Sequence, residues 1–188
     1  MNDETPTFFD AGSFCLRPYR KEDAPQLRDA TNESYELMKE WLEWATPDQT
    51  LEQAEKVCER LGQYYDIDQD YTLAVLQDGR LIGGTGFHPR CGPRAWGCSE
   101  IGMWIRATEA NRGWGTRVLS AMLDWGFGEW GWERLEWRCD TRNLASARVA
   151  IKNGLTLDGT LRSNALAPLG DRRDTHVFGI LKSEWVKS

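Results

Sequence analysis

The chain has 188 residues, with 23 Lys and Arg against 29 Asp and Glu and a formal net charge of −6. This length predicts one domain with its own core, because domains cluster near ~100–150 residues and single ones of ~200–250 occur. The acidic balance argues against a general nucleic-acid surface, which needs clustered Lys and Arg; it suits a cationic ligand, although it is also common for reasons of solubility.

The first third of the chain predicts a flexible start, a strand and several helical pieces. Residues 1–11 are polar and are expected to be flexible, which leaves a single folded domain over 12–188. A strand is predicted at 14–19, a helix follows residues 20–23, and a second helical piece at 34–44 ends before a proline. Thr50 has the N-cap position of another helix, with Glu52 and Gln53 in its first turn.

The remaining elements predict a mixed sheet. Asp78-Gly79 is the strongest short turn signal in the sequence and predicts a hairpin of strands 71–76 and 81–87. A loop at 88–97 is followed by a strand at 98–105, a helix, a strand at 134–139, a short helix at 146–153 and strands at 156–161 and 174–181. An early hairpin with a later strand–helix–strand crossover predicts an α/β fold with a mixed central sheet flanked by helices.

A glycine turn precedes the helix after strand 98–105. Gly113 and Gly115 flank Trp114, and apolar residues then recur at helical spacing. The turn therefore opens into a helix N-terminus, where unpaired N–H groups and the positive end of the helix dipole attract phosphate. Glycine suits such a site because a diphosphate approaches the backbone closely only where no Cβ intervenes. The segment is predicted to bind a pyrophosphate.

The cysteines and the apolar stretches carry further expectations. Five cysteines, an odd number scattered over strands, a helix and a loop, do not predict a disulfide framework. His88, Cys91 and Cys98 are the nearest approach to a metal-ligand set, but there is no Cys-x-x-Cys pair, so no metal is expected.

No apolar stretch approaches the ~20 residues that span a bilayer, and no charged-then-apolar leader is present. A cytoplasmic protein without membrane contact is expected.

Residues of the glycine segment also match a known family. They are Glu100-Ile101-Gly102, Trp104, Arg112-Gly113-x-Gly115-Thr116, Asp124-Trp125, Asp140, Asn143, Ser146 and Asn153-Gly154-Leu155. In this order they resemble the GCN5-related N-acetyltransferase (GNAT) superfamily, and within it the Rim-type ribosomal-protein N-terminal acetyltransferases. The resemblance extends from Leu16 to Trp185 and is dense only over 98–155.

The resemblance implies a mostly antiparallel sheet with two splayed central strands and an acetyl-CoA molecule between them. The residues that it implies for cofactor binding are Met103, Trp104, Ile105, Asn111, Arg112, Gly113, Trp114, Gly115, Thr116 and Asn143. In the strand this role belongs to the backbone, and the side chains of Met103 and Ile105 are expected in the core. The family signature Gln/Arg-x-x-Gly-x-Gly/Ala fits best from Ala110, which lacks the basic first residue; a register from Arg112 restores it but puts Arg117 at a small-residue position.

Two residues carry the catalytic roles that the resemblance implies. Glu100 is expected to deprotonate the acceptor amine or to position a water that does so; the alternative is a solvated strand end. Ser146 is expected to assist the leaving thiolate, where many relatives carry a Tyr, and the alternative is a helix N-cap. Asn143 resembles the residue that anchors the cofactor arm, and the alternative is a loop Asn with positive φ.

The acceptor side is less defined. Tyr35, Trp41 and Trp44 fall where the family builds its acceptor wall, although ordinary packing also explains aromatic residues at helical spacing. His88 ends a strand that leads to this side and is a second-rank base or acceptor contact.

The expected function is acetyl transfer from acetyl-CoA to a primary amine, by a monomer or homodimer. The acceptor is either a protein N-terminus, as the Rim-like pattern suggests, or a small amine such as a polyamine, amino acid or antibiotic. Two other possibilities stay open. One is an acyl-CoA-binding module without turnover, which would not need Glu100 and Ser146. The other is a nucleotide-binding α/β protein, which lacks support because the Walker ending and the third glycine of a dinucleotide fingerprint are missing.

Overall fold

A computed structural model describes residues 5–186. Its helices and strands are β1 (Phe9–Asp10), β2 (Cys15–Pro18), α1 (Ala24–Met38), α2 (Leu51–Asp66), β3 (Tyr71–Gln77), β4 (Arg80–His88), β5 (Cys98–Ile105), α3 (Trp114–Phe127), β6 (Arg134–Asp140), α4 (Leu144–Lys152), β7 (Thr156–Leu166) and β8 (Arg172–Leu181). Three short 3-10 segments, η1 (Lys21–Asp23), η2 (Arg94–Trp96) and η3 (Ala107–Glu109), join them. Among the described helices, none is long and apolar enough to cross a membrane.

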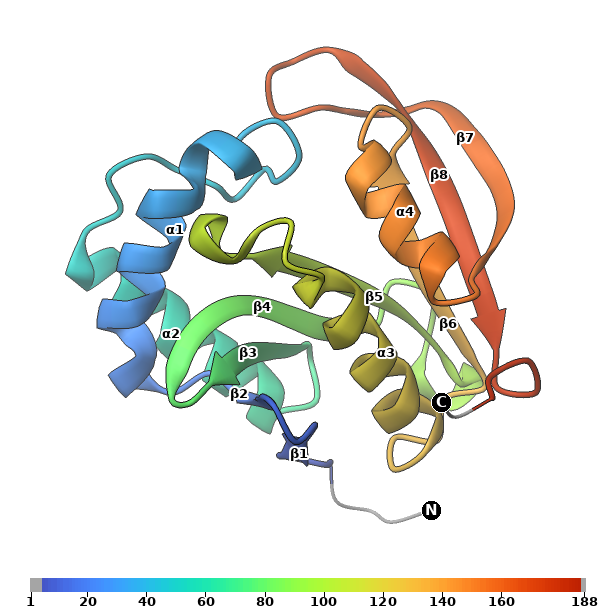
Figure 1. Cartoon of the computed structure of the whole chain (residues 1–188), viewed down its shortest axis with the longest axis horizontal. Helices are drawn as coiled ribbons and strands as arrows, with labels where there is room; N and C mark the ends of the chain where they lie inside the picture. The colour runs from blue at the N-terminus through green and yellow to red at the C-terminus, as the bar shows by residue number, and fades with distance from the viewer. Residues whose placement is uncertain (1–4, 187–188) are drawn as a thin grey trace.

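The strands form one eight-stranded sheet in the order β1-β2-β3-β4-β5-β6-β8-β7, which confirms the predicted mixed α/β fold (Figure 1). All neighbours pair antiparallel except β5 and β6. The predicted hairpin joins β3 to β4, with Asp78 at φ 48° and Gly79 at φ 75°. Positive φ at both central residues is the geometry of the turn that best matches the twist of two strands.

Helices cover both faces of the sheet. One core, formed by side chains of α1 and α2 with Ala74, Leu76 and Leu81, lies on one face. The larger core includes the buried side of α3 packed on Phe87 and Ile101. Burial of these apolar surfaces drives the layers together, at roughly 25 cal/mol per Å² of apolar area removed from water.

Of two local expectations in the helical layer, one is confirmed and one is wrong. Thr50 caps α2 as predicted, and its hydroxyl accepts from the backbone N–H of Gln53 at 3.2 Å. The separate helical piece expected at 34–44 is wrong, because α1 continues unbroken to Met38 and only turns and irregular chain follow before α2. The apolar spacing that suggested a second piece belongs to the buried face of α1, which includes Ser34 and Met38.

The segment expected to be flexible contains an ordered part. Residues 1–4 lie outside the described residues, whereas Phe9 and Asp10 pair with β2 as strand β1. The Phe9 ring stacks on Trp125 with ring centroids 5.4 Å apart. An aromatic residue near the start of the chain therefore finds a place on the core.

Candidate active site

The central strands part where the family resemblance predicts a cofactor arm. β5 and β6 pair in parallel only over Cys98–Glu100 and Arg134–Glu136. Figure 1 shows the two strands starting side by side and then diverging. Among the residues that the structure describes, the edge of β5 that faces β6 therefore has no strand partner from Ile101 to Ile105. Backbone groups at such an edge need a hydrogen-bond partner, and an extended ligand can supply it.

Side chains of this part of β5 alternate between the two cores. Met103 and Ile105 pack against the core that contains α3, as expected. Trp104 packs on the opposite side, against the α1–α2 core. Its ring and that of Trp44 form a T-shaped pair with ring centroids 6.0 Å apart. The side chains of these three residues are therefore engaged in packing, and only their backbone groups are available to bind a cofactor.

The glycine turn leads into α3 with backbone angles that suit glycine. Asn111 has φ 61° and Gly113, the N-cap residue of α3, has φ 80°. No side chain caps this helix among the described residues, so the first N–H groups of α3 are available to a ligand. A Cβ built on Gly113 meets no atom within 4 Å, and the residue is exposed. The turn thus presents an open helix N-terminus, as predicted for phosphate.

Gly115 has a different explanation from the one that the sequence suggested. It lies in the first turn of α3, and a Cβ there would lie 3.2 Å from Cγ2 of Val149 on α4. Close approach of a second helix therefore accounts for this glycine, whereas Gly113 alone faces open space.

A buried acid that the sequence analysis missed holds the turn. Glu109 is only 5% exposed, and its carboxylate accepts from Arg80 at 2.6 Å and from Arg112 and the Trp114 indole at 3.2 Å each. Hydrogen bonding to Arg80, against the opposing effect of burial, lowers the pKa of Glu109 below its usual range. The Trp114 side chain belongs to the core, where its ring meets the edge of Phe14, so its backbone alone faces a ligand at the turn.

Helix α1 fixes the segment that precedes the turn. Glu33 accepts from Arg106 at 2.7 and 2.9 Å and from the backbone N–H of Thr108 at 3.0 Å. Ser34 accepts from the backbone N–H of Ala107 at 2.9 Å. The helix layer on one face of the sheet thereby positions the connection to α3 on the other.

A cavity of about 360 Å³ lies between the start of α3 and the end of α4. It is lined by Thr116, Arg117, Ser120, Lys152, Asn153, Trp185 and Val186. The Arg117 guanidinium stacks over the Trp114 ring, 3.6 Å from its centroid. Two cationic side chains beside a helix N-terminus suit a ligand with several phosphates. Of these residues only Thr116 is among the cofactor-binding residues that the sequence predicts.

Asn143 and Ser146 lie together at the start of α4. Asn143 is the N-cap, with φ −80°, and its Oδ1 accepts from the backbone N–H of Ser146 at 3.0 Å. The alternative of a positive-φ loop Asn is thus wrong, as is that of Ser146 as the cap. The Ser146 hydroxyl instead accepts from the indole of Trp137 at 2.9 Å and lies beside the Cys139 thiol. Burial raises the pKa of that thiol, and the hydroxyl partly offsets the effect.

Glu100 is buried in a cluster of arginines. It is 6% exposed, its Oε1 accepts from Arg90 at 2.9 Å, and Nε of Arg138 lies 3.7 Å from its Oε2. The alternative of a solvated strand end is therefore wrong. Arg138 also donates to Glu136, the residue opposite Glu100 in the parallel pair. Each carboxylate here has a cation within ion-pair distance, as buried charges require.

His88 lies next to Glu100 in the sheet and has a partner of its own. The two residues are opposite one another in the β4–β5 pair, and Nδ1 of His88 lies 2.8 Å from Oδ2 of Asp70. A Cβ built on Gly102 would come within 2.7 Å of Nε2 of His88, so this nitrogen lies directly over Gly102. Hydrogen bonds from His88 and Thr72 outweigh burial and lower the pKa of Asp70.

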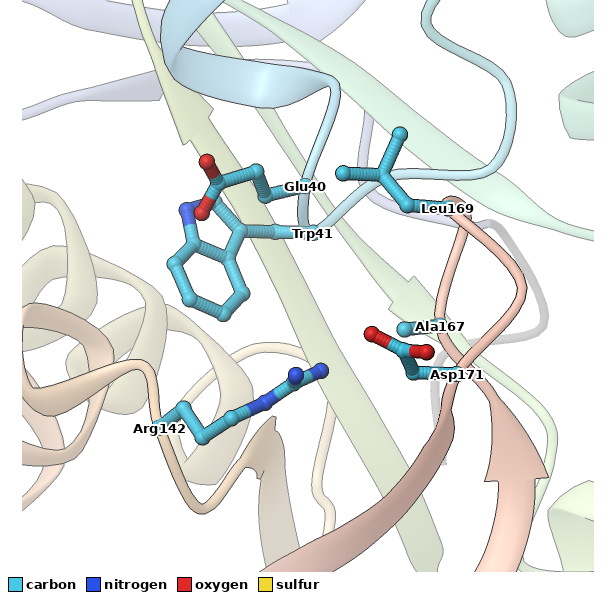
Figure 2. A pocket seen from close by; sticks show the side chains of 6 residues that line it. All are labelled: Glu40, Trp41, Arg142, Ala167, Leu169 and Asp171. Atoms are coloured by element: carbon cyan, nitrogen blue, oxygen red, sulfur yellow. The ribbon is translucent and has the colours of Figure 1, made fainter.

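The other expected acceptor residues are divided between a cavity and the surface. A cavity of about 170 Å³ is lined by Glu40 and Trp41, which come from the α1–α2 connection (Figure 2). Its remaining lining comes from Arg142 and from the β7–β8 hairpin, with Ala167, Leu169 and Asp171. Trp44 is half exposed and contacts Trp104, whereas Tyr35 holds Lys39 over its ring at 5.8 Å. Trp41 alone of the three aromatic residues therefore lines the cavity.

The structure brings together two of the cysteines weighed for a metal site. Ligand atoms of Cys91, Cys98 and Glu136 lie within 4.8 Å of one another, whereas His88 is engaged with Asp70 instead. Oε1 of Glu136 accepts from Arg134 and Oε2 from Arg138, both at 2.9 Å. Because two guanidinium groups already neutralise this carboxylate, we make no metal assignment here.

Comparisons with known proteins agree with this geometry. A family model described as an acetyltransferase (GNAT) domain matches residues 13–156. An uncharacterised N-acetyltransferase of Bacillus subtilis (strain 168), YnaD, is 26% identical over 121 residues, which cover 64% of this chain and 68% of YnaD.

Solved structures share the fold. RimL, a ribosomal L7/L12 alpha-N-protein acetyltransferase solved with coenzyme A, superposes with a TM-score of 0.82 at 18% identity and covers 91% of this chain and 95% of RimL. The microcin C7 self-immunity acetyltransferase MccE, solved with acetyl-CoA and AMP, superposes with a TM-score of 0.81 at 18% identity. The match covers 90% of this chain and 93% of the MccE chain. With a family match over most of its length and an open glycine turn beside two splayed strands, the chain belongs to the GNAT family of acetyltransferases.

Proposed function

We propose that this acetyltransferase transfers the acetyl group of acetyl-CoA to a primary amine, by direct attack while both substrates are bound. The observation that carries the proposal is the combination of the uncapped N-terminus of α3, opened by Gly113, with the unpaired edge of β5. Acetyl-CoA needs both, because its pyrophosphate is anionic and its pantetheine arm carries amide groups. The solved relatives RimL and MccE contain coenzyme A and acetyl-CoA respectively, which supports the same donor.

The proposed donor site extends from α3 to α4. The backbone from Asn111 to Thr116 would hold the pyrophosphate, and Arg117 and Lys152, in the cavity between the helices, would face the remaining phosphate of the nucleotide. The amide Nδ2 of Asn143 is the part of that side chain not used in the cap, and it would donate to the arm. When bound, acetyl-CoA supplies an activated acyl carbon with a thiolate as leaving group.

Ser146 is proposed to assist the departing sulfur. Its oxygen already accepts from Trp137, which directs the remaining lone pair and the hydroxyl hydrogen away from the indole. A hydroxyl hydrogen that reaches the sulfur stabilises negative charge as the C–S bond breaks. Glu100 stays a candidate for taking the acceptor's proton or holding a water, with its carboxylate fixed by Arg90.

The acceptor is proposed to enter through the cavity between the α1–α2 connection and the β7–β8 hairpin. Glu40 and Asp171 place two carboxylates there, and the Arg142 guanidinium is itself paired with buried Asp140 at 2.8 Å. The excess of negative charge favours an amine that arrives as a cation. The Trp41 ring adds a flat surface for a chain that follows the amine, so a peptide N-terminus is the acceptor that we favour over a small amine.

The experiment is thiol release from acetyl-CoA with a panel of N-terminal peptides, polyamines and amino acids. Calorimetry with coenzyme A on Gly113→Asn tests the donor site, because Asn tolerates positive φ but adds a side chain at the turn. Gly131→Asn is the matched control, since Gly131 has φ 69° and equally open surroundings outside the site. We expect Gly113→Asn to lose at least ~10-fold in affinity and the control none. Equal affinities in both variants would remove the turn from the donor site.

An acyl-CoA-binding module without turnover is the second candidate. It is favoured by a single observation, namely that both oxygens of Glu100 face arginines. The same assay separates the two, because such a module would bind coenzyme A and release no thiol with any amine.

A further inference from the structure

A histidine and a carboxylate form an oriented pair at the point where the central strands part. His88 ends β4 and faces Glu100, the last residue of β5 that pairs with β6. Its Nε2 lies over Gly102, two residues farther along β5, where the strand edge has become free. Since Cys98–Glu100 is the whole extent of the parallel pair, Gly102 lies just beyond the apex of the splay.

The Asp70 carboxylate fixes the orientation of this imidazole. Its Oδ2 contacts Nδ1 at 2.8 Å, and its other oxygen accepts from Thr72 at 2.5 Å. When Nδ1 carries the hydrogen of that contact, Nε2 is left as the basic nitrogen. The side chain of His88 is 14% exposed, so it is shielded yet reachable.

The charges around His88 differ from those around Glu100. Asp70, from the segment before β3, is the anion in direct contact with the ring, and the charge of Arg90, in the β4–β5 loop, contributes to the lowered pKa of Asp70. Glu100 has Arg90 at 2.9 Å and Arg138 at 3.7 Å. Two cations stabilise a carboxylate without its proton, whereas an anion stabilises the protonated form of an imidazole. Both oxygens of Glu100 therefore face guanidinium groups, whereas Nε2 of His88 is directed over Gly102 at the free strand edge.

We propose that His88 is the general base that deprotonates the acceptor amine and that Asp70 is the residue that positions it. This inference rests on the proposed acetyltransferase function and assigns one step within it. Gly102 is part of the same arrangement, because any Cβ at this position would collide with Nε2. Glu100 then has a positioning role, in which it holds Arg90 and Arg138 beside the apex.

The proton and electron balance of the step is simple. Nε2 of His88 takes one proton from the acceptor ammonium and later releases it to solvent. The freed lone pair forms a C–N bond to the acetyl carbon, the C–S bond breaks, and its electron pair leaves on sulfur. The second proton lost from nitrogen ends on that sulfur, which yields the free thiol and the acetylated amine.

The test is the pH dependence of turnover in His88→Gln, with His176→Gln as the matched control. His176 is the other histidine of the chain and hydrogen-bonds Thr160 on the neighbouring strand, outside the site. We expect His88→Gln to lower kcat by ~10²–10⁴-fold and to abolish the acid limb of the pH profile, because that is the range general bases contribute. Affinity for coenzyme A should be unchanged in both variants. Asp70→Asn should keep the acid limb but move it to lower pH, since the anion that stabilises imidazolium is gone.

Three further outcomes decide between this inference and others. If free imidazole restores turnover of His88→Ala but not of Glu100→Gln, the result supports His88 as the base. This comparison works even where kcat of His88→Gln is too low for a pH profile. A wild-type acid limb in His88→Gln overturns the assignment while the acetyltransferase proposal stands. If the wild type releases no thiol with any amine, the proposed function itself fails, and this step fails with it.

Discussion

Replacement of Ser146 by Ala separates the structural role of its hydroxyl, which accepts from Trp137, from the catalytic role that we propose for it. The N-cap of α4 survives the change, because Asn143 accepts from the backbone N–H of residue 146 and alanine keeps that group. The Trp137 indole, only 6% exposed, loses its acceptor. An unsatisfied buried donor costs about 1–3 kcal/mol. At about 2–4 °C per kcal/mol for a chain of this size, we expect Tm to fall by roughly 2–12 °C.

The effect on turnover has a separate size and a separate control. If the hydroxyl stabilises charge on the departing sulfur, kcat should fall by about 10–100-fold, at or below the ~10²–10³-fold that a single oxyanion-hole donor contributes. Trp137→Phe removes the same hydrogen bond from the other side and leaves the hydroxyl in place. It should therefore lower Tm and largely preserve kcat. Both are measured by thermal unfolding and by thiol release at saturating acetyl-CoA. Wild-type kcat in Ser146→Ala, together with a lower Tm, would refute the catalytic role.

Three other changes test separate parts of the site. The hydrogen bonds from Arg106 hold the pKa of Glu33 at about 2, against a weaker opposing effect of burial, so its stabilising effect is complete above about pH 5 and is lost as pH falls toward 2. Glu33→Gln should lower the free energy of unfolding in urea by only about 1 kcal/mol at pH 7, because solvent screens this partly exposed pair. Near pH 2 the free energies of unfolding of the variant and the wild type should be equal. Lys152→Ala should narrow the preference for coenzyme A over dephospho-coenzyme A about 10-fold in calorimetry if its ammonium meets the extra phosphate; an unchanged preference would place that phosphate elsewhere. Asn143→Ala should cost about 1 kcal/mol through loss of the cap and also weaken coenzyme A binding, whereas a purely structural Asn would change Tm alone.

Features set by local backbone chemistry were the ones that the sequence predicted well. The Asp78-Gly79 turn and the Thr50 cap depend on a few adjacent residues, and both are present. Strand β5 was predicted with its observed limits, because a loop rich in Gly and Pro precedes it and the glycine turn follows. The separate helix at 34–44 failed because apolar spacing alone does not mark where one helix ends.

Side-chain partnerships across the sheet could not be predicted in this way. Asp70 and His88 are 18 residues apart, and they meet because the β3–β4 hairpin brings one end of β3 beside the end of β4. Glu109 reads as an ordinary acid before a turn, yet Arg80, 29 residues away, reaches it from β4. Such contacts depend on strand register and on which face a residue occupies, and a shift of one residue would reverse the face.

The alternation of side chains along β5 explains how one strand would serve both substrates of the proposed reaction. Glu100 and Gly102 point to the face that carries His88, and Trp104 to the α1–α2 core on the same face. Ile101 and Met103 point to the core that contains α3, whose N-terminus is the proposed phosphate site. The strand edge between these faces is the part that β6 leaves unpaired. A ligand that pairs with that edge would therefore present its acyl end to the face with the base, while its phosphates stay at the turn. The two halves of the proposed reaction then meet at Gly102, where only a residue without a side chain leaves room for the imidazole.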